Sequence, residues 1–409
     1  MRYKPYIQTL LFAALSVLLV FCMIRFPQDS FHAALRGLKI WWDVVFPALL
    51  PFMILSEIMM GFGVVHFIGV LLEPLMRPLF KVPGTGGFVM AMGFSSGYPV
   101  GPKLATQLRQ QKLVTRAEGE RLVCFTSTTD PLFIFGAVAV GFFHDATLGI
   151  TIAIANYVGA LLVGIMLRFH DRRGQITSYT TDQNQPLLLR ALQAMHRARL
   201  KERRPFGQLM GDAVMSSFQT LFVIGGFIII FSVIIEFISM GAISIVLASI
   251  LTTVLSLFQL PEDLSQVFVI GFFEVTQSMQ YMSELNTPIG MEIKLAVASA
   301  LVAWGGISVH AQVASIISST DMRYKPYFIW KGIHAFIAGA LAFLFWKPFQ
   351  SLALFQFTLP AFAEQTPTGG LILTWNNFQH IGLFASLFLL GLALISYMIH
   401  LISKRRLNN

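Results

Sequence analysis

The sequence FVMAMGFSSGYPVGPKLATQL, residues 88–108, decides which fold we predict. An apolar arm at residues 88–94 is followed by small and turn-forming residues at 95–99 and by a second arm at 100–108. Glycine and proline end helices, so the two arms are expected to be separate short helices. Because the residues that follow, 109–112, are again basic, both ends are expected on one side of a bilayer. The pattern predicts a re-entrant helical hairpin.

The composition of the whole chain is that of a membrane protein. Of the 409 residues, 55% are hydrophobic and 12% are charged, with a mean hydropathy of +0.69; a soluble domain carries about 25% charged residues. Nearly uncharged runs at 7–24, 146–169, 214–235 and 381–402 are long enough to cross a bilayer as helices. We therefore predict an all-α polytopic membrane protein. No small-x-small cleavage site follows residues 7–24, so we interpret them as a retained span.

The positive charges indicate how the chain is oriented. The formal net charge of +9 comes from residues in loops and tails, mainly the two ends of the chain and a central segment at 168–204. Because positive loops face the cytoplasm, both termini and the central segment are predicted to be cytoplasmic. The lipid bilayer is the expected partner, and this distribution of charge gives no reason to expect nucleic acid.

Landmarks of the first half recur about 178 residues later in the second half, and each interrupts an apolar helix. The match in order and spacing predicts two repeats of inverted topology, each with a re-entrant hairpin and a broken transmembrane helix. Many secondary transporters are built in this way. The matched positions are Gly93-Phe94 with Gly271-Phe272, Thr129-Asp130-Pro131 with Ile307-Ser308-Val309, and Glu57 with about Glu236.

The predicted organisation has five parts. An N-terminal transmembrane helix at 1–36 precedes the first repeat at 37–169, and a basic cytoplasmic linker at 170–205 leads to the inverted second repeat at 206–347. An external loop and a C-terminal transmembrane helix fill residues 348–409. Residues 241–260 are ambiguous, since they can either span the bilayer or lie along its outer interface.

Four helix interruptions, at residues 95–99, 126–131, 274–278 and 304–310, are the predicted site of a small polar or anionic solute. Helices that stop near the midplane direct unpaired N–H groups and positive dipole ends at an anion, and nearby hydroxyls and amides replace its water shell. The predicted substrate-binding residues are Ser95, Ser96, Gly97, Tyr98, Lys103, Thr128, Thr129, Glu274, Thr276, Gln277, Gly306, Ser308 and His310.

Ionisable residues at membrane depth need a reason, because a charge there costs about 2.5–3.5 kcal/mol on insertion scales. Asp130, which lies in a run of hydroxyl residues, is predicted to bind a coupling cation or proton, and Glu274 to contact the substrate. Glu57 and Glu236 fit a buried pairing as well as a function, and Lys103 either faces an anionic substrate or extends to the cytoplasmic surface. No Cys/His cluster has metal-binding spacing, so no metal and no other cofactor is expected.

Other interpretations of these residues remain open. Hydroxyls in membrane helices often only bond a carbonyl one turn back. Residues 93–97 fit the pattern G-x-S-x-G, so an intramembrane serine hydrolase using Ser95 and His310 is one alternative, although that motif requires a strand before the serine. A scaffold that binds a partner through the central segment is another, and a homo-oligomer is left open. A transporter without enzymatic activity is the preferred reading.

The motifs at residues 93–103 and 126–131 resemble the sporulation integral membrane protein YlbJ family of endospore-forming bacteria, and the resemblance covers nearly the whole chain. It implies two nucleoside-recognition, or Gate, domains whose hairpins resemble those of concentrative nucleoside transporters. It also implies transport of dipicolinic acid, an aromatic dicarboxylate, across the outer forespore membrane.

The residues are compatible with that substrate, since Tyr98 and Trp304 can stack on a flat ring. Concentrative nucleoside transporters typically have glutamine, threonine and glutamate at the first hairpin tip, where this chain has Ser95-Ser96-Gly97. A nucleoside-type solute is therefore the alternative substrate class. A carboxylate at position 274 would repel a dicarboxylate unless it were protonated, paired or turned away.

Overall fold

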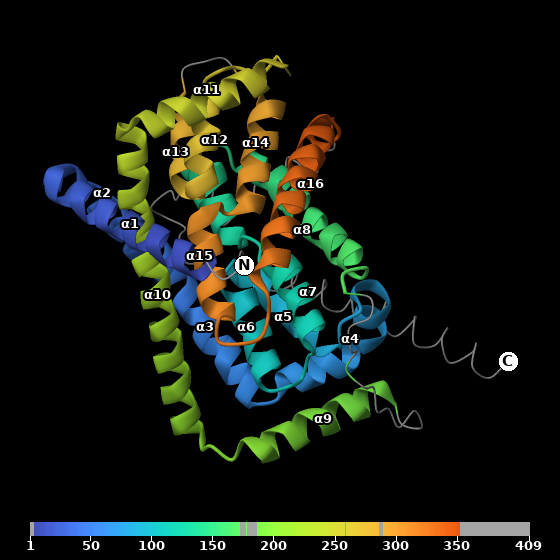
Figure 1. Ribbon diagram of the computed structural model, residues 1–409. Helices are drawn as coiled ribbons and strands as arrows, with labels where there is room; N and C mark the ends of the chain where they lie inside the picture. The colour runs from blue at the N-terminus through green and yellow to red at the C-terminus, as the bar shows by residue number, and fades with distance from the viewer. Residues whose placement is uncertain (1–3, 172–176, 178–185, 258, 286–288, 352–409) are drawn as a thin grey trace, which may run out of the picture.

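The computed structural model describes residues 4–171, 177, 186–257, 259–285 and 289–351, and every regular element within them is a helix (Figure 1). The all-α prediction is therefore confirmed for this part of the chain. The predicted C-terminal span at 381–402 lies outside the described residues.

Several helices are long and apolar enough to cross a membrane. Among the described residues there are four of them: α8 (Ala146–Leu167), α10 (Phe206–Met240), the pair α14 and α15 (Met291–Ile317), and the greater part of α16 (Tyr324–Ser351). Two bent helix pairs near the N-terminus raise the number to six if each pair is one span. The chain is thus a multi-pass membrane protein.

The N-terminal helices bend sharply at two positions. α1 (Lys4–Arg25) turns through 107° into α2 (Pro27–Ile40), and the chain continues through the π-helix η1 (Trp41–Val45) into α3 (Phe46–Gly61). A second bend of 85° follows at Gly63, whose φ of +78° glycine adopts without strain, and leads into α4 (Val64–Phe80).

Short helices follow in both halves, where the sequence predicts hairpins and broken spans. In the first half they are α5 (Thr85–Ser96), α6 (Val100–Gln110), α7 (Arg116–Thr126) and the π-helix η2 (Leu132–Phe142). In the second half they are α12 (Leu264–Phe273), α13 (Val275–Ser283), α14 (Met291–Trp304) and α15 (Gly306–Ile317).

The longest helix, α10, connects two helices that lie across its ends. It begins at Phe206, before the apolar run at 214–235, because Pro205 precedes the helix and the polar first turns remain helical. Its 35 residues extend about 50 Å, more than the hydrocarbon thickness of a bilayer. α9 (Leu187–Glu202) and α11 (Ala242–Leu257) cross its opposite ends in Figure 1, so the ambiguous segment does not run back alongside α10.

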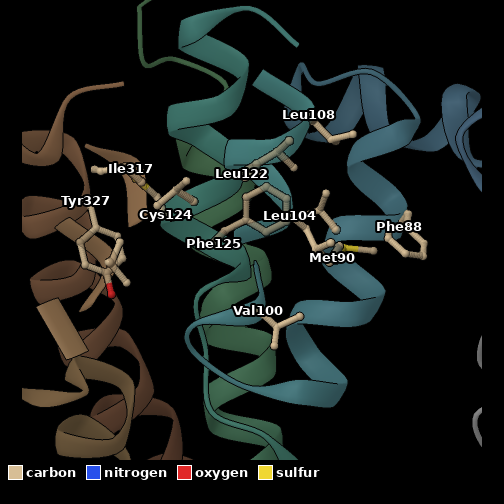
Figure 2. Packing of buried hydrophobic residues seen from close by; sticks show 14 of the residues in the cluster. Phe88, Met90, Val100, Leu104, Leu108, Leu122, Cys124, Phe125, Ile317 and Tyr327 are labelled. Atoms are coloured by element: carbon tan, nitrogen blue, oxygen red, sulfur yellow. The ribbon is translucent and has the colours of Figure 1, made fainter. Parts of the chain in front are cut away.

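A hydrophobic core surrounds α5 and α6, which we call the first hairpin-like pair, as we call α12 and α13 the second. Figure 2 shows Phe88 of α5, Leu104 of α6 and Phe125 of α7 packed together, with Tyr327 of α16 on the far side of α7. The backbones approach closely because small residues lie at the contact: a Cβ atom on either Gly93 or Gly101 would come within 2.5 Å of the carbonyl oxygen of Thr126. The break after α7 is therefore held directly against α5 and α6.

Paired charges join the elements at one end of the bundle. The buried carboxylate of Glu120 accepts hydrogen bonds from Arg323 at 2.8 Å and lies 2.9 Å from His170. Arg109 donates to both carboxylate oxygens of Asp321, at 2.8 and 2.9 Å, and lowers the pKa of that carboxyl group. The loop between α15 and α16 is thus tied to α6 and α7.

Two adjacent glycines of α10 test how α10 packs against η1. A Cβ atom on Gly225 would come within 2.7 Å of the Trp41 ring, whereas one on Gly226 would meet nothing within 4 Å. Gly225→Leu should destabilise the protein by about 1–3 kcal/mol through overpacking. Gly226→Leu is the matched control and should leave the melting temperature in detergent unchanged or raised. Equal melting temperatures for the two variants would contradict the packing of α10 on η1.

Candidate functional site

One cavity touches all four predicted interruptions. It is lined by residues 97–99 between α5 and α6, residues 129–130 between α7 and η2, Glu274 between α12 and α13 with the first two residues of α13, and the first turns of α15. Its volume of about 100 Å³ is several times the ~10–15 Å³ that one water needs. Apolar walls from η1, η2 and α10 complete it, so it has the mixed lining of a small-molecule site.

At the first interruption, Gly97 allows the chain to turn between α5 and α6. Its φ is +88°, and a Cβ atom there would come within 2.8 Å of a carboxylate oxygen of Asp130. The next residue, Tyr98, lines the cavity and donates its hydroxyl to the carbonyl of Val302 in α14. This hydrogen bond connects the first half of the chain directly to the second.

The two carboxylates of the cavity each cap a helix. Asp130 accepts a hydrogen bond from the backbone N–H of Phe133 at 2.8 Å, at the start of η2. Glu274 accepts one from the N–H of Gln277 at 2.7 Å, at the start of α13. Both negative groups lie where the helix dipole favours them. Glu274 is thus paired with its own helix, and Asp130 has a structural role beside the coupling role that its position predicts.

The other two helices that start at the cavity have no side-chain cap. α6 begins after Pro99. α15 begins at Gly306, with a φ of +80°, directly after Gly305, with a φ of +81°. The first N–H groups of a helix have no partner within it, and Ser308 adds a buried hydroxyl to the first turn of α15 at the cavity wall. The cavity therefore combines two carboxylates that are bonded to helix N–H groups with two helix ends whose dipoles favour an anion.

The structure brings about half of the predicted binding residues together. Those that line the cavity are Gly97, Tyr98, Thr129, Asp130, Glu274, Thr276 and Ser308, and Gln312 of α15 joins them. The predicted residues that do not line it are Ser95, Ser96, Lys103, Thr128, Gln277, Gly306 and His310.

Two of these outlying residues are bonded elsewhere. Lys103 pairs with Glu57 at 2.9 Å and donates to Ser216 at 3.2 Å, so its ammonium is turned away from the cavity. Glu57 is held by these helix contacts and also lines a second, polar cavity of about 340 Å³ beneath α9. The side-chain amide of Gln277 donates to Ser232 in α10 at 3.2 Å.

The serine and histidine of the hydrolase reading have other partners. The hydroxyl of Ser95 donates to the carbonyl of Met92 at 3.2 Å, one turn back in its own helix. Nδ1 of His310 lies 2.8 Å from the hydroxyl of Tyr324, and the His310 ring packs 4.1 Å from that of Trp304. The structure therefore pairs Ser95 and His310 with different neighbours and not with each other.

Sequence reasoning missed a buried lysine beside the first broken helix. Lys331 of α16 is fully buried, and its ammonium donates to the carbonyl of Ser127 at 2.9 Å. It interrupts the apolar run at 328–346, together with His334, and an ionisable residue within a predicted span is a sign of a functional site. Both residues lie outside the four predicted interruptions, so they are not among the predicted site residues.

A glycine pair tests how the second broken helix meets the second hairpin-like pair. A Cβ atom on Gly306 would lie 2.6 Å from the carbonyl oxygen of Phe273, and its φ is positive, whereas one on Gly332 of α16 would meet nothing within 4 Å. Gly306→Ala should cost at least about 1–2 kcal/mol in stability. Gly332→Ala should cost nothing. Thermal unfolding followed by tryptophan fluorescence compares them, and an unaffected Gly306→Ala would contradict this contact.

Comparisons with known proteins agree on the family. A family model described as Gate, nucleoside recognition, matches residues 42–178, which include the first hairpin-like pair and the first broken helix. The sporulation integral membrane protein YlbJ of Bacillus subtilis (strain 168) is 45% identical to this chain over 379 residues, 92% of each protein. The chain therefore belongs to the YlbJ family of sporulation integral membrane proteins.

Proposed function

We propose that this protein transports a small anionic molecule across a bacterial membrane and binds it in the cavity between the four helix interruptions. The observation that carries the proposal is that one cavity is lined by all four. In secondary transporters the substrate lies where discontinuous helices meet, and uncapped helix ends face its charged groups. A multi-pass chain with a match to a nucleoside-recognition model is consistent with this role.

We infer that two inverted repeats bring the interruptions together, with α5–α6 and α12–α13 as re-entrant hairpins. The order of elements from α3 to α8 is repeated from α10 to α16, which supports the repeat. A contact between equivalent positions supports it further: Nε2 of His334 lies 2.9 Å from the carbonyl of Asn156, and the two residues are separated by 178. By the charge rule, both termini and α9 are cytoplasmic.

The substrate we propose is dipicolinate, moved across the outer forespore membrane during sporulation. Resemblance to the family implies this molecule, and the Bacillus subtilis relative is named as a sporulation protein. The cavity suits a flat dicarboxylate because apolar walls and the Tyr98 ring lie between the uncapped ends of α6 and α15. Glu274 does not oppose such an anion strongly, since its carboxylate is bonded to Gln277.

A nucleoside-type solute is the second candidate, because the matching family model is described as nucleoside recognition. A nucleoside has a flat ring but no carboxylate, so it would use the hydroxyls and amides of the cavity, such as Thr276 and Gln312, rather than the helix ends.

Purified protein in liposomes distinguishes these substrates. Uptake of radiolabelled dipicolinate should exceed that by empty liposomes and be reduced by excess unlabelled dipicolinate, but not by uridine. Uptake of uridine with none of dipicolinate would favour the nucleoside reading. If neither moves under any ion gradient, the transport proposal is wrong.

A matched pair of serines on α15 tests where the solute binds. Ser308 is buried at the cavity, whereas Ser315, two turns further along the same helix, is exposed. Ser308→Phe should fill the cavity and reduce dipicolinate uptake by about tenfold or more, since losing 1.4 kcal/mol of binding has that effect. Ser315→Phe should transport normally. Normal transport by both variants, at equal amounts of inserted protein, would contradict the site.

A further inference from the structure

A second polar centre lies behind the cavity and is formed by Lys331 and His334 of α16. Both side chains are buried, Lys331 completely. The ammonium nitrogen of Lys331 lies 2.9 Å from the carbonyl oxygen of Ser127, 3.2 Å from Nδ1 of His334 and 5.6 Å from the centre of the Tyr98 ring. In the part of the chain that the structure describes, no carboxylate contacts the Lys331 ammonium.

The carbonyl that Lys331 contacts belongs to the end of a broken helix. Ser127 is the C-cap of α7, where the last carbonyl groups carry the negative end of the helix dipole. In transporters with discontinuous helices, such carbonyl ends coordinate the coupling cation. Here the ammonium of Lys331 occupies that position, so the cation is part of the chain.

The hydrogen bonds fix the tautomer of His334. Nε2 of His334 faces the carbonyl of Asn156, which can only accept, so Nε2 carries a hydrogen. Nδ1 of the neutral ring then has a lone pair and accepts from the Lys331 ammonium. With Lys331 as an ammonium the pair holds one excess proton, and both hydrogen-bond partners of the ammonium among the described residues are uncharged groups.

The other titratable groups around Lys331 are uncharged in their ordinary protonation states. The titratable side chains that face it are Tyr98 from the first interruption, Cys124 from α7, His310 from α15 and Tyr327 from α16. α14 presents no titratable side chain among its buried residues, and α8 contributes Asn156 and Tyr157. A buried positive charge with such neighbours is costly to keep and easily given up.

Tyr98 connects this centre to the cavity. The Lys331 ammonium lies over the Tyr98 ring, Tyr98 also lines the cavity, and its carbonyl lies 3.4 Å from the Ser127 hydroxyl. Thr128, between Ser127 and the cavity residue Thr129, has a fully buried hydroxyl with no hydrogen-bond partner among the described residues. The Ser127 carbonyl is therefore only two residues along the chain from Thr129 at the cavity wall.

We propose that Lys331 and His334 form a proton-binding site that couples solute movement to the proton gradient, with the lysine ammonium taking the place of a coupling metal cation. The proposal rests on the transport function proposed above. The excess proton passes from Nζ of Lys331 to Nδ1 of His334 along their existing contact, while Nε2 keeps its hydrogen on the Asn156 carbonyl. Nδ1 then releases the proton to water in a state of the transporter that admits water to this buried pair. The pair is then a neutral amine and a neutral imidazole, and the attraction to the carbonyl end of α7 is weakened.

The test measures the uptake of dipicolinate into liposomes that contain the protein, under an imposed pH gradient or an imposed sodium gradient. Lys331→Arg keeps a cation against the Ser127 carbonyl but cannot release its proton, and His334→Gln keeps a donor for Asn156 and an acceptor for Lys331 but cannot titrate. For each protein, the accumulation of dipicolinate driven by the pH gradient is divided by the rate at which the protein exchanges dipicolinate at equal pH on both sides. The ratio separates coupling from transport itself. Lys325→Gln, an exposed lysine at the start of the same helix, is the matched control.

The wild type and Lys325→Gln should accumulate dipicolinate under a pH gradient without sodium. In Lys331→Arg and His334→Gln the ratio of accumulation to exchange should fall by about tenfold, within the usual range of coupling free energies. Either variant keeping the wild-type ratio would overturn the proposal, as would accumulation that follows sodium. If the wild type exchanges no dipicolinate at all, the transport proposal itself fails and the coupling proposal falls with it.

Discussion

Backbone groups at an interrupted helix must find partners outside that helix, and most features of this structure follow from that requirement. Where α7 stops, the carbonyl of Ser127 is bonded by Lys331. Where η2 and α13 start, Asp130 and Glu274 accept from the freed N–H groups. In an apolar solvent an unsatisfied backbone group costs several kcal/mol, so these side chains are needed for the breaks to exist.

The same requirement explains why the cavity can attract a solute. Two of the helices that begin there, α6 and α15, have no side-chain cap. The positive dipole ends of both helices lie at the cavity, although in α6 the N–H of Val100 is already bonded to the carbonyl of Gly97 and Pro102 has no N–H. Close contacts hold the four interruptions together: Gly93 and Gly101 against Thr126, Gly306 against Phe273, and Tyr98 bonded to Val302. The proposed transport site is thus built from helix ends rather than from a dedicated set of charged side chains.

The sequence was sufficient for the helices and for their interruptions, because the length of apolar runs and the positions of glycine and proline are local properties. The direction of side chains was less predictable. Lys103 lies close to the first interruption in sequence, yet it faces Glu57 on the other side of α6. His310 falls in the second interruption, yet it turns toward Tyr324. These contacts depend on which helices pack together, and the role of Lys331 depends on the packing of α16 against the end of α7.

The account is tested most directly by asking whether a solute shields the cavity wall. With Cys22 and Cys124 replaced by alanine, Ser308→Cys and Ser315→Cys place single thiols at the cavity and on the exposed face of the same helix. Dipicolinate should slow the labelling of the Ser308→Cys protein by a small thiol reagent and leave that of the Ser315→Cys protein unchanged. Equal labelling of Ser308→Cys with and without dipicolinate, in a protein that transports it, would contradict the proposed site.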